Sequence, residues 1–286
     1  MGIDTGTPEG WQAALAALHW QLEMGVDEAI GDVPVNAYDL PVAAVKAAAV
    51  AAAAPVAAQA ARPARAADAP YVPQANAAER AAAVADAAVA EAAARAGAAG
   101  SLEALREALA GYEHCEVKKG ARNLVFADGR AGARVLILGE APGREEDLEG
   151  RPFVGAAGQL LDRMFGAIGL SRENPDLERA LYITNVMPWR PPGNREPTPE
   201  EIAMMRPFVA RHVDLAAPEV IVVMGNTPCS ALLGVKGILR LRGTWAEALG
   251  RPVMPMTHPA YLLRNPAAKR EAWADLLEIQ ARLRGK

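Results

Sequence analysis

The sequence predicts an α/β domain in which helices cover both faces of a central four-stranded parallel sheet, a three-layer α-β-α sandwich. Two observations lead to this prediction. Short, uncharged apolar runs have the length of buried parallel strands. Helical patterns separate these runs, and an alternation of strand and helix is typical of parallel sheets. The predicted strands lie at 135–138, 181–186 and 220–225, and the segment 252–266 is predicted to form a short fourth strand and a loop.

Helices are predicted between and around these strands from apolar spacing and end signals. One of them is opened by Thr198, with a proline at the first helical position, where a missing N–H does no harm. Another carries Leu160, Leu161 and Phe165 on one side. The predicted helices cover 101–111, 155–169, a segment after Thr198, a segment starting at Asn226, and 267–284.

The N-terminal third has a different composition. Between residues 41 and 100, 33 of 60 residues are alanine, and prolines interrupt the tract. Such a segment offers little large apolar surface to offset the entropy lost on ordering. We therefore predict a helical segment over 1–30, an Ala/Pro-rich low-complexity linker over 31–100 with a marginal alanine helix at 76–97, and a globular domain over 101–286 that carries the chemistry.

Composition limits the cellular compartments and the binding partners that we expect for the protein. No apolar run approaches the roughly 20 residues of a membrane span, and the N-terminus lacks the pattern of a signal peptide. Only two cysteines are present, which suits a reducing cytoplasm. The net charge is −4, but residues 181–286 hold 14 Lys/Arg and 9 Asp/Glu. Because local potential decides contact with phosphate, this basic half leaves DNA binding possible without indicating it.

Polar groups follow the predicted strands. The predicted strands are followed by Glu140, Asn185, Asn226-Thr227 and His258, and the carboxyl ends of parallel strands meet at one edge of a sheet. The four histidines lack the paired spacing of a zinc site, and no phosphate loop or nucleophile elbow is present. We therefore expect one pocket with no metal.

The side chains of this pocket suit recognition of a planar base. An amide such as Asn185 offers a donor and an acceptor in one plane. The Phe153 ring, in the loop after Gly150, can stack on a heterocycle. His258 can donate to an oxygen on which negative charge develops. This combination favours base recognition over acyl or phosphoryl transfer.

Four blocks of sequence, over roughly residues 112–284, resemble the family 4 uracil-DNA glycosylases: GEAPGREEDLEGRPFVGAAGQLLDRM, YITNV, RPPGNREPTPEE and THPAYLLRNP. The resemblance implies the three-layer glycosylase fold and hydrolysis of the bond between uracil and deoxyribose, which leaves an abasic site for base excision repair. It also implies that Phe153 stacks on uracil, Asn185 reads its edge, His258 points at its O2 and the Ala141 N–H contacts it. Glu140 then positions water or stabilises a cation.

The implied substrate is uracil-containing DNA, from which the nucleotide must be flipped before it can reach a pocket. Leu262 and Leu263 are expected to fill the gap in the base stack, and the alternative is that they form a buried turn. Arg195, Arg264 and the helix N-terminus at Asn226 are expected to contact phosphates. We expect a monomer in the cytoplasm, associated with the nucleoid during repair.

One departure from the family concerns its four-iron, four-sulfur cluster, which four cysteines usually hold. The matching positions here are Tyr112, Cys115, Trp189 and Met205. One thiolate of four cannot hold such a cluster. We therefore expect no cofactor, with packing of large side chains in place of the metal.

Two alternatives remain open from the sequence. The first is a non-catalytic DNA-binding or recruitment module of the same fold, against which the intact site residues argue. The second is a glycosylase for another deaminated base, such as hypoxanthine, which depends on a pocket volume that the sequence does not report. An assay with uracil-containing oligonucleotides separates the three readings.

Overall fold

The structure is a computed structural model that describes residues 77–285. The helical segment predicted over 1–30 and the part of the predicted linker up to residue 76 lie outside the described residues. The strands are β1 (Ala127–Gly129), β2 (Val135–Gly139), β3 (Leu181–Asn185), β4 (Val220–Met224), β5 (Ala246–Ala248) and β6 (Arg251–Met256). The helices are α3 (Ala77–Ala98), α4 (Leu102–Ala110), α5 (Arg144–Glu149), α6 (Ala156–Gly166), α7 (Pro199–Ala216), α8 (Asn226–Leu233), α9 (Ile238–Leu241), α10 (Pro259–Arg264) and α11 (Lys269–Leu283), with short 3₁₀ turns η2 (Glu116–Gly120), η3 (Pro192–Asn194) and η4 (Pro266–Ala268).

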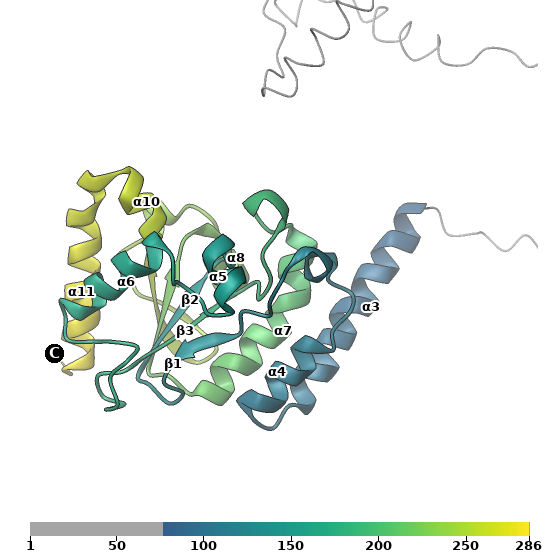
Figure 1. The fold of residues 1–286 in the computed structure, drawn as a ribbon, viewed down its shortest axis with the longest axis horizontal. Helices are drawn as coiled ribbons and strands as arrows, with labels where there is room; N and C mark the ends of the chain where they lie inside the picture. The colour runs from purple at the N-terminus through teal and green to yellow at the C-terminus, as the bar shows by residue number, and fades with distance from the viewer. Residues whose placement is uncertain (1–76, 286) are drawn as a thin grey trace, which may run out of the picture. The chain divides into compact units, whose positions relative to one another are not determined.

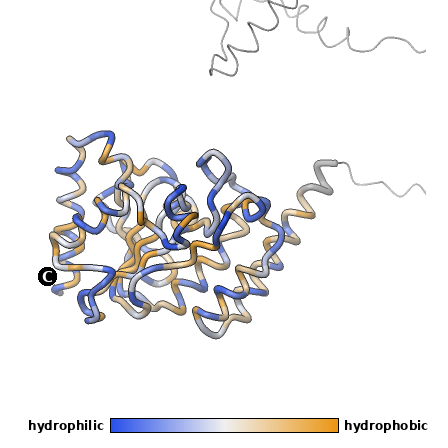
Figure 2. The backbone as a smooth tube through the Cα atoms, viewed as in Figure 1, coloured by the Kyte–Doolittle hydropathy of each residue, from blue (hydrophilic) through white to orange (hydrophobic). Residues whose placement is uncertain are grey.

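These strands form one sheet in the order β1-β3-β2-β4-β6-β5. The four predicted strands β3, β2, β4 and β6 are parallel and central, which confirms the predicted sheet. Figure 2 shows these central strands in the orange of hydrophobic residues. Two antiparallel edge strands, β1 and β5, were not predicted. Each has three residues and no apolar run, so the sequence carries no strand pattern there. These strands are defined only by their pairing with a neighbouring strand.

The sheet separates two hydrophobic cores, because successive side chains of a strand point to opposite faces. Leu136 and Leu138 of β2 belong to one core, together with buried residues of α3, α4, α7 and α8. Val135 and Ile137 belong to the other core, together with α6 and α11. Figure 1 shows the same layers, with α3, α4 and α7 on one side of the strands and α6, α10 and α11 on the other. The three-layer sandwich is thus confirmed.

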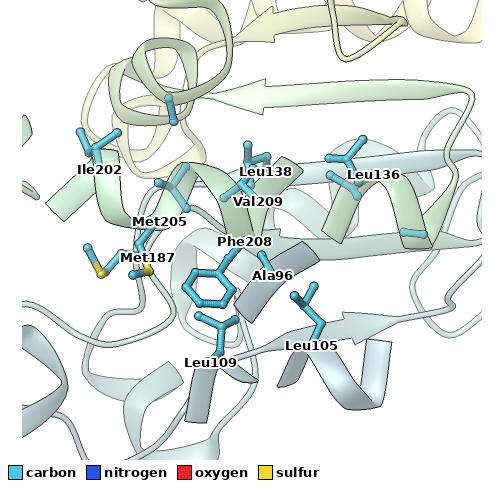
Figure 3. Close-up of a cluster of buried hydrophobic side chains, with 14 of the residues drawn as sticks. Ala96, Leu105, Leu109, Leu136, Leu138, Met187, Ile202, Met205, Phe208 and Val209 are labelled. Carbon is cyan, nitrogen blue, oxygen red and sulfur yellow. The ribbon is translucent and has the colours of Figure 1, made fainter. Parts of the chain in front are cut away.

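The alanine helix predicted at 76–97 is present as α3, but it belongs to the folded domain and not to a linker that extends to residue 100. The helix belongs to the same compact unit as the sheet and packs along α7. Alanine methyls are small enough to let two helices approach closely, and Leu105, Leu109 and Phe208 supply the large apolar surface that the alanines lack (Figure 3). The buried face of this segment consists of Ala88, Ala92, Ala96 and Ala99.

Two polar contacts fix α3 further. The Tyr112 hydroxyl donates to the Ala88 carbonyl at 2.8 Å. The Arg211 guanidinium donates twice to the Ala99 carbonyl, at 2.8 and 2.9 Å, just beyond the end of the helix. The folded domain therefore begins before residue 101. None of the helices in the described range 77–285 is long and apolar enough to cross a membrane.

Candidate active site

The carboxyl edge of the sheet brings the predicted polar residues together. Gly139 at the end of β2 pairs with Asn185 at the end of β3, so Glu140 leaves the sheet beside Asn185. On the other side, Met224 of β4 pairs with Met256 of β6. The chain then continues into Asn226 and His258, the first residues of the next connections. All four post-strand groups therefore lie at one edge, as the parallel topology requires.

The floor of the site is Gly139, whose missing side chain leaves room for two others. A Cβ placed there would lie 2.3 Å from Asn185 Oδ1 and 2.6 Å from Phe153 Cε2. The Asn185 amide and the Phe153 ring thus meet over the glycine, from two different elements. Asn185 is 6% exposed, and its Oδ1 is a buried acceptor without a hydrogen-bond partner among the described residues. An unpaired buried acceptor costs free energy unless a ligand satisfies it.

The Phe153 ring forms one wall of the site. Its backbone has φ of +54°, in the left-handed region that non-glycine residues rarely adopt. The ring stacks on the His258 imidazole, with centroids 5.4 Å apart and an interplanar angle of 28°. A planar group is therefore already stacked in this site by the protein itself, which shows that the geometry suits flat rings.

His258 is the N-cap of α10, and this role fixes its tautomer. Its Nδ1 accepts the Ala260 N–H at 3.1 Å, so the ring proton of the neutral form lies on Nε2. Burial, together with the nearby charge of Arg264, lowers the pKa of His258 to about 4. At neutral pH the side chain is therefore an uncharged imidazole that presents one N–H donor.

Glu140 is half-buried, and the Thr227 hydroxyl donates to its Oε2 at 2.6 Å. Burial raises the pKa of Glu140, while the hydrogen bond from Thr227 lowers it. Thr227 lies just after β4 and is 4% exposed. Its uncharged hydroxyl therefore orients the Glu140 carboxylate. The sequence placed Thr227, together with Asn226, directly after a strand, but it did not predict the contact with Glu140.

Comparison with known proteins agrees with this geometry. The family model for the uracil DNA glycosylase superfamily matches residues 126–277. The chain belongs to the uracil DNA glycosylase superfamily. A type-4 uracil-DNA glycosylase of Thermotoga maritima is 39% identical over 167 residues, which cover 57% of this chain and 84% of that protein. A type-4 uracil-DNA glycosylase of Archaeoglobus fulgidus is 35% identical over 190 residues, or 63% and 92% of the two chains. The resemblance to family 4 is thus confirmed.

The residues expected to contact DNA differ in their exposure to solvent. Leu262 is 0% exposed and belongs to the core, which favours the alternative that it is buried over its expected insertion into DNA. Its side chain faces the sheet because α10 packs on α6. Leu263, the next residue, is 42% exposed on the outer side of the same helix, and Arg264 is exposed beside it.

The other two expected contacts are engaged within the protein. Both terminal nitrogens of Arg195 donate to the Glu201 carboxylate, at 2.6 and 2.8 Å. The Asn226 amide oxygen accepts the N–H groups of Gly237 and Ile238, which ties the loop after α8 to the sheet edge. Asn226 itself is exposed at the start of α8.

The four positions that match the cluster ligands of this glycosylase family do not fit a cluster. Tyr112, Cys115, Trp189 and Met205 are each at most 3% exposed and belong to the same hydrophobic core. Tyr112 packs edge-on against Phe208 at 5.4 Å. Burial raises the pKa of the Cys115 thiol, which disfavours the thiolate that iron requires. Three of the four side chains are not iron–sulfur cluster ligands, and all four are buried in this core.

Proposed function

We propose that the protein is a uracil-DNA glycosylase that binds a flipped uracil and hydrolyses its N-glycosidic bond, leaving an abasic site. The type-4 relatives named above support this activity. Within the site, the observation that carries the proposal is the orphaned Asn185 Oδ1, buried over Gly139 beside the Phe153 ring. Uracil N3–H is a donor and its O4 an acceptor, so the planar amide of Asn185 can satisfy both at once. Phe153 would stack on the base.

This arrangement discriminates against cytosine. Cytosine carries an acceptor at N3 and an amino donor at position 4, so both of its edge groups would face like groups of Asn185. A buried donor or acceptor left without a partner costs about 1–3 kcal/mol. Selection against the normal base of DNA therefore rests on one amide whose orientation the surrounding packing holds.

The bond breaks toward an oxocarbenium-like sugar, and the electron pair of the C1′–N1 bond leaves with uracil. We assign His258 as the donor to O2, because its Nε2–H is available when the ring is neutral. The Ala141 N–H would contact the base from the turn after β2. Glu140, held by Thr227, positions the attacking water or stabilises the developing cation. The water oxygen then forms the new bond to C1′.

DNA would approach the carboxyl edge of the sheet. Flipping a nucleotide costs a few kcal/mol in lost pairing and stacking. Exposed Leu263 is the side chain that can enter the vacated stack, and Arg264 and the α8 N-terminus at Asn226 are candidates for flanking phosphates. Both terminal nitrogens of Arg195 already donate to Glu201. Only the outward face of the Arg195 guanidinium is therefore available to a phosphate.

The activity is tested with 5′-labelled oligonucleotides that carry one uracil, followed by alkali treatment. We expect strand cleavage at uracil and none in a matched oligonucleotide with cytosine. Asn185→Ala is the matched variant and should abolish most of the cleavage. Binding to uracil-containing DNA without cleavage would instead indicate a recruitment module. Cleavage at hypoxanthine but not at uracil would assign the pocket to the other base.

We also propose that the protein acts without an iron–sulfur cluster, as a monomer in the cytoplasm and at the nucleoid. The support for the first point is the set of non-ligating side chains at the matching positions, packed into the core. Purified protein should be colourless and contain no stoichiometric iron. A brown preparation with one cluster per chain would refute this. Size-exclusion chromatography with light scattering tests the monomer.

A further inference from the structure

Phe153 has an energetically unfavourable backbone that the rest of the structure must enforce. Its φ of +54° is a left-handed conformation that costs a bulky residue on the order of 1–3 kcal/mol. The conformation matters because it aims the ring at Asn185 and His258. Something close to the loop 152–155 must therefore hold it.

Arg172 holds the carbonyl side of this loop. Its terminal nitrogens donate to the Pro152 carbonyl at 2.9 Å and to the Phe153 carbonyl at 3.0 Å. The same guanidinium donates to Asp128 at 2.9 Å and to Asp162 at 2.8 Å. The Arg172 side chain is only 8% exposed, and its two contacts to the loop carbonyls are buried, where hydrogen bonds are strong.

The segment that carries Arg172 is itself anchored to the sheet. The preceding residue, Ser171, forms a parallel bridge with Ala180, immediately before β3. The Ser171 N–H donates to the Arg179 carbonyl at 2.9 Å, and its carbonyl accepts the Leu181 N–H at 3.1 Å. Arg172 thus transmits the position of β3, the strand that carries Asn185, to the loop that carries Phe153.

Two further constraints act on the other side of the loop. The Glu146 carboxylate accepts the N–H groups of Val154 at 3.1 Å and Gly155 at 3.0 Å. Gly158, in the first turn of α6, lies so close that a Cβ there would be 1.8 Å from the Phe153 carbonyl oxygen. The carbonyls are thus held by a cation and the following amides by an anion.

We propose that Arg172 is a positioning residue for base recognition, which sets the Phe153 ring at a fixed place relative to Asn185. This inference rests on the proposed function, since it names the group that keeps the uracil-stacking ring in place. A lysine cannot replace it, because one ammonium cannot span two successive carbonyls and two carboxylates as a planar fork does. Arg172 does not touch the base and acts only through Phe153.

The test compares Arg172→Lys with Arg134→Lys. Arg134 is also largely buried and also donates to carboxylates and to one carbonyl, that of Leu283, but it precedes β2 at the opposite edge of the sheet. Arg172→Lys keeps the charge beside Asp128 and Asp162, so the domain should fold. Thermal unfolding of both variants is measured with single-turnover excision and with inhibition by free uracil.

We expect Arg172→Lys to slow single-turnover excision about 100-fold, since a misplacement of 1 Å can cost that much. It should also raise the inhibition constant of free uracil about fivefold, as expected when one stacking contact of roughly 1 kcal/mol is lost. Arg134→Lys should lose comparable thermal stability while keeping the parent rate and the parent inhibition constant. In a Phe153→Ala background, Arg172→Lys should cause no further loss of rate, because the group through which it acts is gone.

Three outcomes would overturn the inference. The first is a folded Arg172→Lys protein with the parent rate and inhibition constant. The second is an equal loss of rate with and without the Phe153 ring. The third is a loss of uracil inhibition in Arg134→Lys as large as in Arg172→Lys. A parent protein that releases no uracil at all would refute the proposed function instead, so the two failures are distinguishable.

Discussion

Gly139→Ala is a small change that should impair base recognition without replacing any side chain of the site. The added Cβ would lie 2.3 Å from Asn185 Oδ1 and 2.6 Å from Phe153 Cε2, whereas ordinary contact begins at 3.4 Å. The amide oxygen must therefore retreat by about 1.1 Å and the ring by about 0.8 Å. Gly139 is not among the glycines with positive φ, so its backbone accepts alanine and the effect is purely steric.

The expected magnitude follows from these displacements. A shift of about 1 Å in positioning groups can cost roughly 100-fold in rate, equivalent to about 2.7 kcal/mol of activation free energy. Overpacking of a tight site should also lower the free energy of unfolding by about 1–3 kcal/mol. The loss of activity should therefore exceed what partial unfolding explains, because most of the protein stays folded at 25 °C.

The assay is single-turnover excision of uracil at saturating enzyme, together with inhibition by free uracil and thermal unfolding. The matched control is Gly166→Ala at the end of α6, where an added Cβ meets nothing within 4 Å. That variant should keep the parent rate and gain up to about 1 kcal/mol of stability. If Gly139→Ala is folded and excises uracil at the parent rate, the base does not bind over this glycine and the site is misassigned.

Three other predictions follow from the same contacts. His258→Ala should slow single-turnover excision by roughly 10²–10³ and leave gel-shift binding to a non-cleavable uracil analogue intact; a parent rate would make the histidine structural. Thr227→Val removes the hydrogen bond that lowers the pKa of the buried Glu140 carboxyl, so that pKa rises further and the acid limb of the pH–rate profile moves to higher pH; an unmoved limb would show that the Glu140 carboxylate is not the titrating group. A chain that begins at Val72 should keep full activity and stability. One that begins at Ala99 should lose about 2 kcal/mol from the buried methyls of Ala88, Ala92 and Ala96 and about 1 kcal/mol from the Tyr112 hydrogen bond, measured by urea unfolding; equal stability of the two would show that α3 is dispensable.

Much of the fold and of the site was determined by the sequence alone. The four central strands are continuous apolar runs, which a sheet covered on both faces requires, so their positions could be read directly. Once the sheet is parallel, geometry brings Glu140, Asn185 and His258 to one edge whatever the details of packing. The helix opened by Thr198 was likewise predictable, because its capping box is a local interaction between residues three apart.

The predictions from local sequence differed from the structure where contacts between distant segments determine burial. The sequence predicted an alanine helix at 76–97 but assigned it to a linker, since its own alanines bury little surface. Its stability comes from Phe208, Leu105 and Tyr112, which belong to other elements. Leu262 and Leu263 are identical in chemistry, and only the docking of α10 on the core decides that one is buried and the other exposed.

The tertiary structure alone decided how the site residues are held. Gly139 is crowded by two side chains from other elements, which no spacing in the sequence reports. Thr227 reaches Glu140 across 87 positions of chain, and Arg172 reaches the carbonyls of Pro152 and Phe153 across about 20. The sequence therefore determined which groups meet at the sheet edge, because strand ends are set locally. Their orientation depends on hydrogen bonds between distant segments, which exist only after the chain has folded.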